Sequence, residues 1–192
     1  MITKYIILAL FLHLTFSCAS PQQLEIKENA NPKYDVLRNG MRYVIYVADD
    51  KISHTEAAIE IENRIKEYLG DRGLVLVDFD QNSLANILRN NGQITEGQAK
   101  LVSSAADLII TGRYREEDLA DENINKAGTY RSRIRLSVAV TESNSAVEKG
   151  RFQETCEELA SSFESATIHA GIACGDKVAK KVMEKLLYIY GK

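Results

Sequence analysis

The sequence has little net charge, little proline and no tryptophan. Its 24 Lys and Arg residues stand against 27 Asp and Glu residues, which gives a net charge of −3. A protein that binds nucleic acid needs a basic surface to neutralise phosphates. The charge balance therefore argues against nucleic acid as a partner. The only two prolines, Pro21 and Pro32, both lie near the N-terminus.

The sequence also lacks the motifs that mark common catalytic and metal sites. Beyond the first 17 residues its histidines are His54 and His169, and neither has the further ligands that a zinc site requires at set spacing. No Gly-x-Ser-x-Gly motif, phosphate loop or redox-spaced cysteine pair is present. Asp78 and Asp80 would suit acid–base chemistry, but helix capping is the commoner use of such residues. We therefore expect no enzymatic activity, bound metal or cofactor.

The longest apolar run covers residues 5–16 and follows Lys4. It is too short to remain as a membrane-spanning helix, and a cationic start before about 7–15 apolar residues is typical of a secretion signal. The run ends in LTFSC, which resembles the bacterial lipobox, although Thr15 stands where that motif usually has Leu. The resemblance implies cleavage after residue 17 and fatty acylation, such as palmitate, at Cys18. Two or three acyl chains suffice for stable anchoring.

An ordinary signal cut after Ser17 or Ser20 is the alternative to lipidation. Residues 1–17 include one charge, Lys4, so their removal takes the net charge from −3 to −4. The absence of Asp after Cys18 favours the outer membrane, by analogy with known lipoprotein sorting, and we expect the periplasmic side. Residues 18–40 are polar and predict a short tether, which leaves residues 41–192 as one soluble domain.

Hydrophobic periodicity predicts alternating strands and helices in this domain. Buried strands are indicated at 42–48 (RYVIYVA), 74–80 (LVLVDFD) and 107–112, and clean alternation at 130–141 marks an antiparallel strand with one wet face. Capping boxes at Ser53/Glu56 and Thr95/Gln98 predict helix starts, Asp80 or Ser83 caps a short helix, residues 113–126 form a hairpin loop, and a long helix spans about 165–190. We expect an α/β fold with one mixed sheet of about five strands, helices packed on it, and a C-terminal helix.

The stretch from Ala57 to Gly112 resembles a group of bacterial envelope proteins. They include the curli secretion lipoprotein, the penicillin-binding-protein activator lipoprotein LpoB, the flagellar assembly protein FlgT and the N-terminal domain of TolB. The matching positions are Gly73, Val77, Asp78, Gln81, Leu84, Ala106, Asp107, Thr111 and Gly112. All of these are determinants of fold, so the resemblance implies little about function. The segment at 113–133 is short and charged, unlike the long amphipathic membrane hairpins of the pore-forming member. The predicted tether is short and has two prolines, unlike the long proline-rich tether of the activator.

The resemblance also bears on residues 147–163. The helical spacing of Phe152, Cys156, Leu159 and Phe163 favours a helix. A strand would pair with the preceding strand through a turn at residues 142–146, as in the resembling proteins, and on that ground we expect a strand.

Cys18 is the predicted lipidation site, so Cys156 and Cys174 are the two remaining cysteines. An oxidising compartment permits a disulfide between them. Buried free cysteine is a common core residue, which favours two thiols over a bridge.

The one polar feature above background is the row Arg131, Arg133 and Arg135 on the strand at 130–141. The row would suit an anionic partner, but pairing with Glu154 and its neighbours, or with residues 116–118, is the more ordinary use. We expect a non-enzymatic accessory or scaffold lipoprotein that acts in cell-envelope assembly by binding another envelope protein, with homo-oligomers allowed. The alternative is a surface lipoprotein that binds an anionic host or glycan ligand through this row.

Overall fold

The computed structural model describes residues 40–90, 94–117 and 128–191. The predicted signal peptide, Cys18 and the predicted tether up to residue 39 lie outside these ranges. None of the helices in the described ranges combines the length and apolar character that a membrane span needs. The elements follow in the order β1 (Arg42–Ala48), α3 (Glu56–Gly70), β2 (Val75–Leu76), α4 (Gln81–Arg89), α5 (Glu96–Ser103), β3 (Leu108–Glu117), β4 (Tyr130–Glu142), β5 (Val147–Ala160) and α6 (Phe163–Tyr190).

The strands form one mixed sheet in the order β2-β1-β3-β4-β5. β1 runs parallel to both β2 and β3, whereas β3, β4 and β5 pair antiparallel. The connections from β1 to β2 and from β2 to β3 contain helices, as parallel pairing requires. This confirms the predicted α/β fold with helices packed on a single sheet and a long C-terminal helix.

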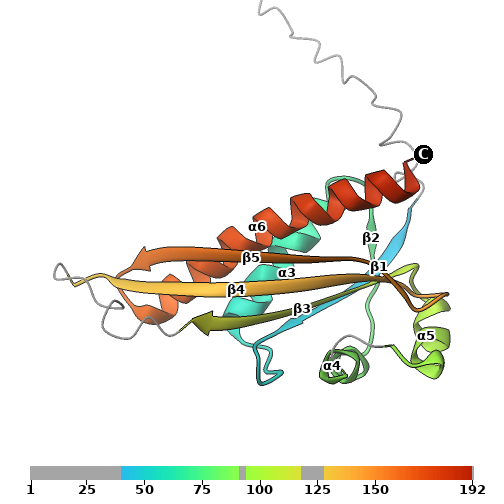
Figure 1. Ribbon diagram of the computed structural model, residues 1–192, viewed down its shortest axis with the longest axis horizontal. Coiled ribbons are helices and arrows are strands. Elements are labelled where there is room, and N and C mark those ends of the chain that lie inside the picture. The colour runs from blue at the N-terminus through green and yellow to red at the C-terminus, as the bar shows by residue number, and fades with distance from the viewer. Residues whose placement is uncertain (1–39, 91–93, 118–127, 192) are drawn as a thin grey trace, which may run out of the picture. The chain divides into compact units, whose positions relative to one another are not determined.

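Helices cover the sheet on both sides. α3 and α6 lie on one side, and α4 and α5 lie on the other (Figure 1). β1 is buried on both faces, because Tyr43 and Val47 join the core under α3 and α6 while Val44 and Ala48 join the core under α4 and α5. This explains why β1 reads as a continuous apolar run without alternation.

Two glycines let α6 lie close against α3. A Cβ at Gly175 would come within 3.0 Å of the Arg64 Cβ and 3.2 Å of the Ile61 carbonyl oxygen, and one at Gly171 within 3.3 Å of the Ile61 side chain. Larger side chains at these positions would push the two helices apart. The close packing fixes α6 over β4 and β5.

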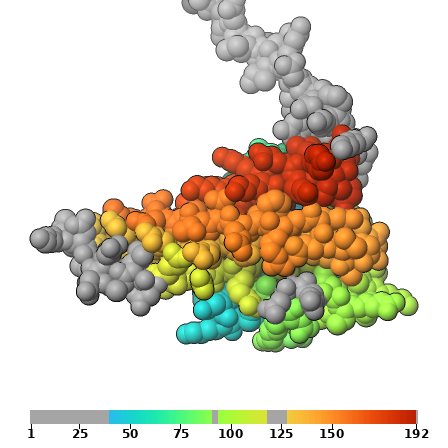
Figure 2. All heavy atoms as spheres, viewed as in Figure 1, coloured from blue at the N-terminus to red at the C-terminus, as the bar shows by residue number. Residues whose placement is uncertain are grey.

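Residues 147–160 form strand β5, which confirms the expected strand in place of the helix that periodicity favours. β5 pairs with β4 along almost its whole length, with one register irregularity at Val140/Thr141. Its other edge carries no neighbouring strand in the described part of the sheet. In Figure 2 the orange atoms of β5 form an uncovered band beside the red atoms of α6.

The predicted start of α3 is wrong by two residues. Ser53 does not cap the helix, because its backbone N–H donates to Asp49 Oδ1 at 2.6 Å in the preceding turn. Thr55 is the N-cap, and its side chain accepts from the Ala58 N–H. The other predicted caps agree with the structure, since Asp80 caps α4 and Thr95 with Gln98 forms the capping box of α5.

Two predicted strand boundaries also differ from the structure. The strand predicted at 74–80 is reduced to Val75–Leu76, where β2 pairs with the first two residues of β1 at the sheet edge. The strand predicted at 107–112 continues to Glu117, so the first residues of the predicted hairpin loop belong to β3. The longer β3 provides a full partner for β4 as far as Arg133. Residues 118–126 of that loop lie outside the described residues.

Candidate functional site: the open face of the sheet

Strands β3, β4 and β5 turn one face toward α3 and α6 and expose much of the other. Side chains alternate between the two faces of a strand, so Ile134 and Leu136 are fully buried under α6 while Arg133 and Arg135 point away from it. We call the second side the open face. Strand register assigns to it Arg113, Arg115 and Glu117 on β3, Arg131, Arg133, Arg135 and Ser137 on β4, and Arg151, Gln153, Thr155, Glu157 and Leu159 on β5.

The structure brings Arg131, Arg133 and Arg135 together as a row along β4, as alternation predicts. All three have carboxylate partners. Arg133 binds Glu157 through Nε at 2.8 Å and Nη2 at 2.6 Å, and Arg131 Nε lies 3.2 Å from the same carboxylate. Arg135 Nη2 lies 2.5 Å from Glu117 Oε1. The row is therefore neutralised in part by the strands on both sides of it.

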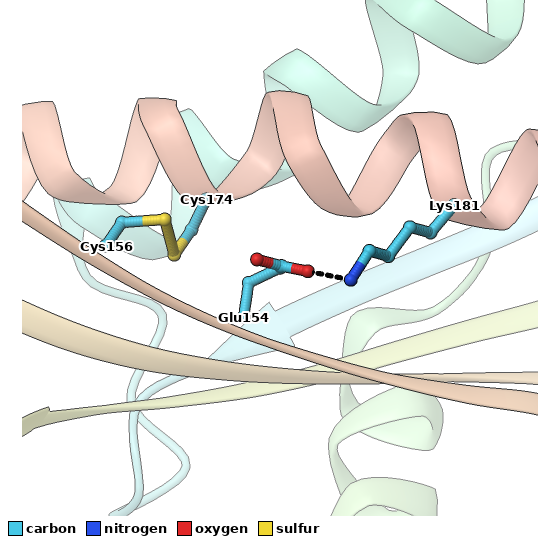
Figure 3. Close-up of a disulfide and its surroundings, with 4 residues drawn as sticks. All are labelled: Glu154, Cys156, Cys174 and Lys181. Carbon is cyan, nitrogen blue, oxygen red and sulfur yellow. Dashed lines mark ion pairs between the residues drawn. A yellow bond between two sulfur atoms is a disulfide. The ribbon is translucent and has the colours of Figure 1, made fainter.

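One predicted partner of this row lies on the opposite face. Glu154 points toward α6 and forms an ion pair with Lys181 (Figure 3). Because side chains alternate, a carboxylate that faces the row must be an odd-numbered residue of β5, and Glu157 takes that place opposite Arg133. Residues 116–118 were the other predicted partners of the row. Of these, Glu117 pairs with Arg135, and Asp118 lies outside the described residues.

Arginine outnumbers glutamate on the open face, although the whole chain has a net charge of −3. Most of the excess comes from Arg113, Arg115 and Arg151, which sequence reasoning did not single out. Arg151 binds Glu148 on the same strand, with Nη2 2.7 Å from Oε2. Arg113 donates through Nη2 to the Leu88 carbonyl oxygen at 2.8 Å, at the end of α4.

Cys156 and Cys174 form a disulfide that joins β5 to α6 (Figure 3). It lies on the side of the sheet that α3 and α6 cover, which we call the covered face. Their Cα atoms lie 5.6 Å apart, which is an ordinary separation for a bridge. Both residues are buried in the larger core. Two free thiols, the favoured alternative from sequence, are therefore not what the structure contains.

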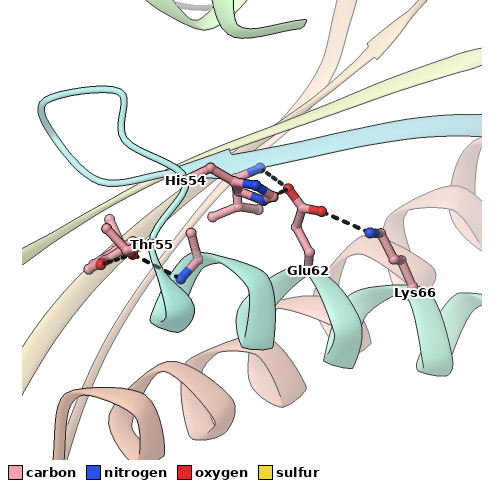
Figure 4. A network of polar contacts seen from close by, with 7 residues as sticks. His54, Thr55, Glu62 and Lys66 are labelled. Carbon is pink, nitrogen blue, oxygen red and sulfur yellow. Dashed lines mark hydrogen bonds and ion pairs between the residues drawn. The ribbon is translucent and has the colours of Figure 1, made fainter. Parts of the chain in front are cut away.

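A buried carboxylate, Glu62, organises a polar network between β1 and α3 (Figure 4). Its Oε1 accepts from the Val47 N–H at 2.7 Å and lies 3.1 Å from His54 Nε2, and its Oε2 lies 2.8 Å from Lys66 Nζ. With both oxygens bound, Glu62 serves as a structural anchor, since such networks rigidify their surroundings.

The aromatic neighbours of this network are also held in place. His54 stacks on Tyr46 with ring centroids 5.3 Å apart. Burial, and next the charge of Glu62, raise the pKa of Tyr46, so the phenol stays neutral. The Thr55 hydroxyl and the Tyr114 hydroxyl lie 2.6 Å apart, which joins the start of α3 to β3. These contacts fix the loop between β1 and α3 at the border of the open face. Within the described ranges, no group of three or more His, Cys, Asp or Glu side chains is placed to hold a metal ion.

Comparisons with known proteins find similarity in fold to solved structures. No family model matches the chain, and no curated protein matches it. The named families that the sequence resembles are thus not confirmed. Among solved structures, a lipoprotein from Neisseria meningitidis is 10% identical with a TM-score of 0.40, covering 76% of this chain and 99% of its own. A minor lipoprotein from Acinetobacter baumannii is 11% identical with a TM-score of 0.38, covering 77% and 90%.

A third similar structure is a hypothetical protein from Chlamydia trachomatis. It is 8% identical with a TM-score of 0.49, and the match covers 79% of this chain and 97% of the other. At such identities the likeness concerns the fold and carries no statement about ligands or partners.

Proposed function

We propose that this chain is a bacterial envelope lipoprotein that is anchored through Cys18 and acts, without catalysis, by binding another envelope protein through the open face. The observation that carries the proposal is the open face itself, a broad sheet surface rich in arginine, with glutamate and neutral polar side chains among them, that no helix covers over β4 and β5 in the described part of the chain. The sequence pattern around Cys18 supports the anchor.

The chemistry of the open face favours a protein over a polyanion. Arg131 and Arg133 share the Glu157 carboxylate, and Arg135 binds Glu117. A row of arginines that is already paired in part gains less from a uniformly negative ligand, whereas a protein surface can match mixed charges one by one. Leu159, which is 48% exposed, adds an apolar contact at the end of the same face.

The anchor and the mode of action are compatible with one another. A chain with a short predicted tether holds its domain close to the membrane surface, where potential protein partners are concentrated. We place it in the outer membrane with the domain on the periplasmic side, as an accessory or scaffold component of envelope assembly. Lipidation is tested by replacing Cys18 with Ala, which should move the protein from the membrane to the soluble fraction. Unchanged membrane retention would refute the anchor.

The open face is tested with a photo-activated cross-linking residue placed at Thr155 in the full-length protein, in the native cells. Thr155 is exposed on the open face, and Lys180 is exposed on the outer surface of α6 and serves as the matched control. We expect one cross-linked protein of defined mass from Thr155 and none from Lys180. Equal adducts from both positions, or no adduct from Thr155, would overturn the proposal.

The second candidate function is binding of an anionic host or glycan ligand through Arg131, Arg133 and Arg135. The excess of arginine over glutamate on the open face supports it. It predicts binding that weakens steeply with salt and is abolished by Arg133→Glu. Binding of a protein partner that persists at high salt would favour the first function.

A further inference from the structure

The exposed apolar side chains of this domain gather at one end of the sheet. A single row of register partners crosses all five strands at this end, and it consists of Leu76, Tyr43, Leu108, Glu142 and Val147. Leu76 and Val147, at the two edges of the row, are both exposed. The row lies where β1 and β3 begin, β4 ends and β5 begins. We call this end of the domain the basal end.

Two helices add to the apolar surface of the basal end. α6 ends there, since the Tyr190 hydroxyl donates to Glu142 Oε1 at 3.0 Å, and Tyr188 in its last turn is exposed. α5 lies beside the turn between β4 and β5, and it exposes Leu101. Figure 1 shows α5, the end of α6 and the start of β1 at the same end of the sheet.

Most of the exposed large apolar side chains among the described residues belong to this end. Five of the seven lie there, namely Val75, Leu76, Leu101, Val147 and Tyr188. The other two, Ile59 near the start of α3 and Leu159 near the end of β5, lie toward the opposite end of the sheet. Apolar side chains that gather on a surface mark an interaction site.

The chain enters the domain at the basal end. Gly40, the first described residue, lies beside Val75, because a Cβ built on it would be 4.0 Å from Val75 Cγ2. Residues 18–39 join Cys18 to this point. The opposite end is far from it, since Leu159 lies about 40 Å from Val147 along β5. An acyl group on Cys18 would therefore hold the basal end nearer to the bilayer than the opposite end.

We propose that the basal end rests on the lipid bilayer, with its apolar side chains in the head-group region and the strands running away from the membrane. The inference rests on the proposed anchor at Cys18 and goes beyond it by assigning the orientation of the domain and the surface that contacts lipid. In this orientation the open face stands upright on the membrane, where a protein partner can reach it.

The chemistry of the basal end suits the boundary between lipid and water. A tyrosine such as Tyr188 combines an apolar ring with a polar hydroxyl, and such residues are enriched at membrane interfaces. Two acidic side chains of the basal end have cationic partners, because Asp107 pairs with Arg42 and Glu142 pairs with Lys149. This pairing reduces their repulsion from anionic head groups.

The test uses the absence of tryptophan from the chain, since a single introduced tryptophan then reports on one site. The full-length, lipidated protein is reconstituted into vesicles of phosphatidylethanolamine and phosphatidylglycerol, with and without brominated acyl chains that quench tryptophan fluorescence on contact. Val147→Trp places the probe at the basal end. Leu159→Trp, on the same strand, is the matched control, because the two native side chains are 50% and 48% exposed.

We expect the emission of Val147→Trp to shift to shorter wavelength and to be quenched by the brominated lipid several-fold more than that of Leu159→Trp. Equal quenching of the two variants would overturn the orientation. A shift of the Val147→Trp emission without quenching would mean that a protein surface, such as a second copy of this chain, covers the basal end, and would also overturn the proposal.

Charged substitutions test whether the basal end itself contacts the lipid. In the Val147→Trp protein, Leu101→Glu together with Tyr188→Glu places charges at this end, which contact with lipid disfavours, and most of the quenching should be lost. Ile59→Glu is the same kind of change toward the opposite end and should leave quenching unchanged. All three native side chains are exposed, so the variants should fold, which circular dichroism checks. Quenching that persists in the double substitution would overturn the contact.

The anchor and the orientation can fail separately. A Val147→Trp protein that floats with the vesicles but is not quenched would overturn the orientation and leave the anchor at Cys18. A Cys18→Ala/Val147→Trp protein that stays bound to the vesicles and is quenched would support lipid contact by the basal end and overturn Cys18 as the anchor.

Discussion

The two faces of β4 differ sharply in how far their side chains are buried. On the covered face Ile134, Leu136 and Val138 are completely buried, whereas on the open face the side chains of Arg133 and Arg135 are 33% and 46% exposed. The difference arises because the long α6 runs over β4 and β5, while the short α4 contacts β1 and β3. We infer that substitutions on the covered face change stability and that substitutions on the open face change binding.

The largest expected difference in the free energy of unfolding is between substitutions at two adjacent residues, Leu136 and Arg135. Leu136→Ala removes a fully buried side chain and should lower the free energy of unfolding by about 2–5 kcal/mol. Arg135→Ala, its neighbour on the open face, should cost at most about 1 kcal/mol. Urea unfolding followed by circular dichroism measures both. Similar losses in the two variants would contradict the comparison.

Removing the disulfide should lower the stability of the domain without changing binding at the open face. Cys156 and Cys174 are 18 residues apart in sequence, and the loss of a bridge that closes a short loop should cost about 2–4 kcal/mol. A Cys156→Ala/Cys174→Ala double variant should show this loss in urea unfolding, and a reductant should destabilise the wild type but not the variant. Binding at the open face should survive, because neither sulfur lies on it.

The Glu62 network should give a smaller loss. Glu62→Ala leaves the buried Val47 N–H without its acceptor and should cost about 1–3 kcal/mol. Glu62→Gln keeps an acceptor oxygen and loses only the charge that faces Lys66, so a smaller loss is expected in thermal unfolding. A Gln variant as unstable as the Ala variant would mean that the charge, rather than the hydrogen bond to β1, holds this region.

The smallest effect on stability should come from the ion pair between Arg133 and Glu157. Both side chains are about one-third exposed, and surface pairs contribute roughly 0–1 kcal/mol. Arg133→Gln should therefore leave the free energy of unfolding within that range. A double-mutant cycle with Glu157→Gln isolates the pair, and its coupling should fall as salt is added. A coupling of several kcal/mol would place this pair among the determinants of the fold.

Elements with strong local patterns were predictable from sequence. β1 is predicted with its observed bounds, Arg42–Ala48, because β-branched and aromatic residues fill it without interruption. β4 follows from alternation, and the capping box at Thr95 follows from side-chain spacing. Each of these depends on contacts between near neighbours in the chain.

Features that depend on distant parts of the chain were not predictable. The apolar stretch after Gly73 reads as a strand of full length, yet only Val75 and Leu76 pair. β2 lies at the sheet edge beside the start of β1, while Val77 and Phe79 pack on the core under α4. The partner of Arg133 depends on how β5 is registered past the irregularity at Val140/Thr141.

The candidate site was partly visible in the sequence. The row Arg131, Arg133 and Arg135 follows from period-two spacing on one strand. Arg115 escaped notice because residues 113–117 read as loop, and their place in β3 becomes clear only when β4 lies alongside. The same holds for Cys156 and Cys174, whose separation is set by how α6 crosses β5.

The bond between Cys156 and Cys174 links an edge strand to the final helix. A newly made chain in a reducing cytoplasm lacks that bond and is less stable by about 2–4 kcal/mol. A weakly folded chain unfolds readily, which suits passage through a narrow translocation channel. For a chain that is exported, formation of this disulfide after translocation then stabilises the folded domain and keeps α6 attached to β5.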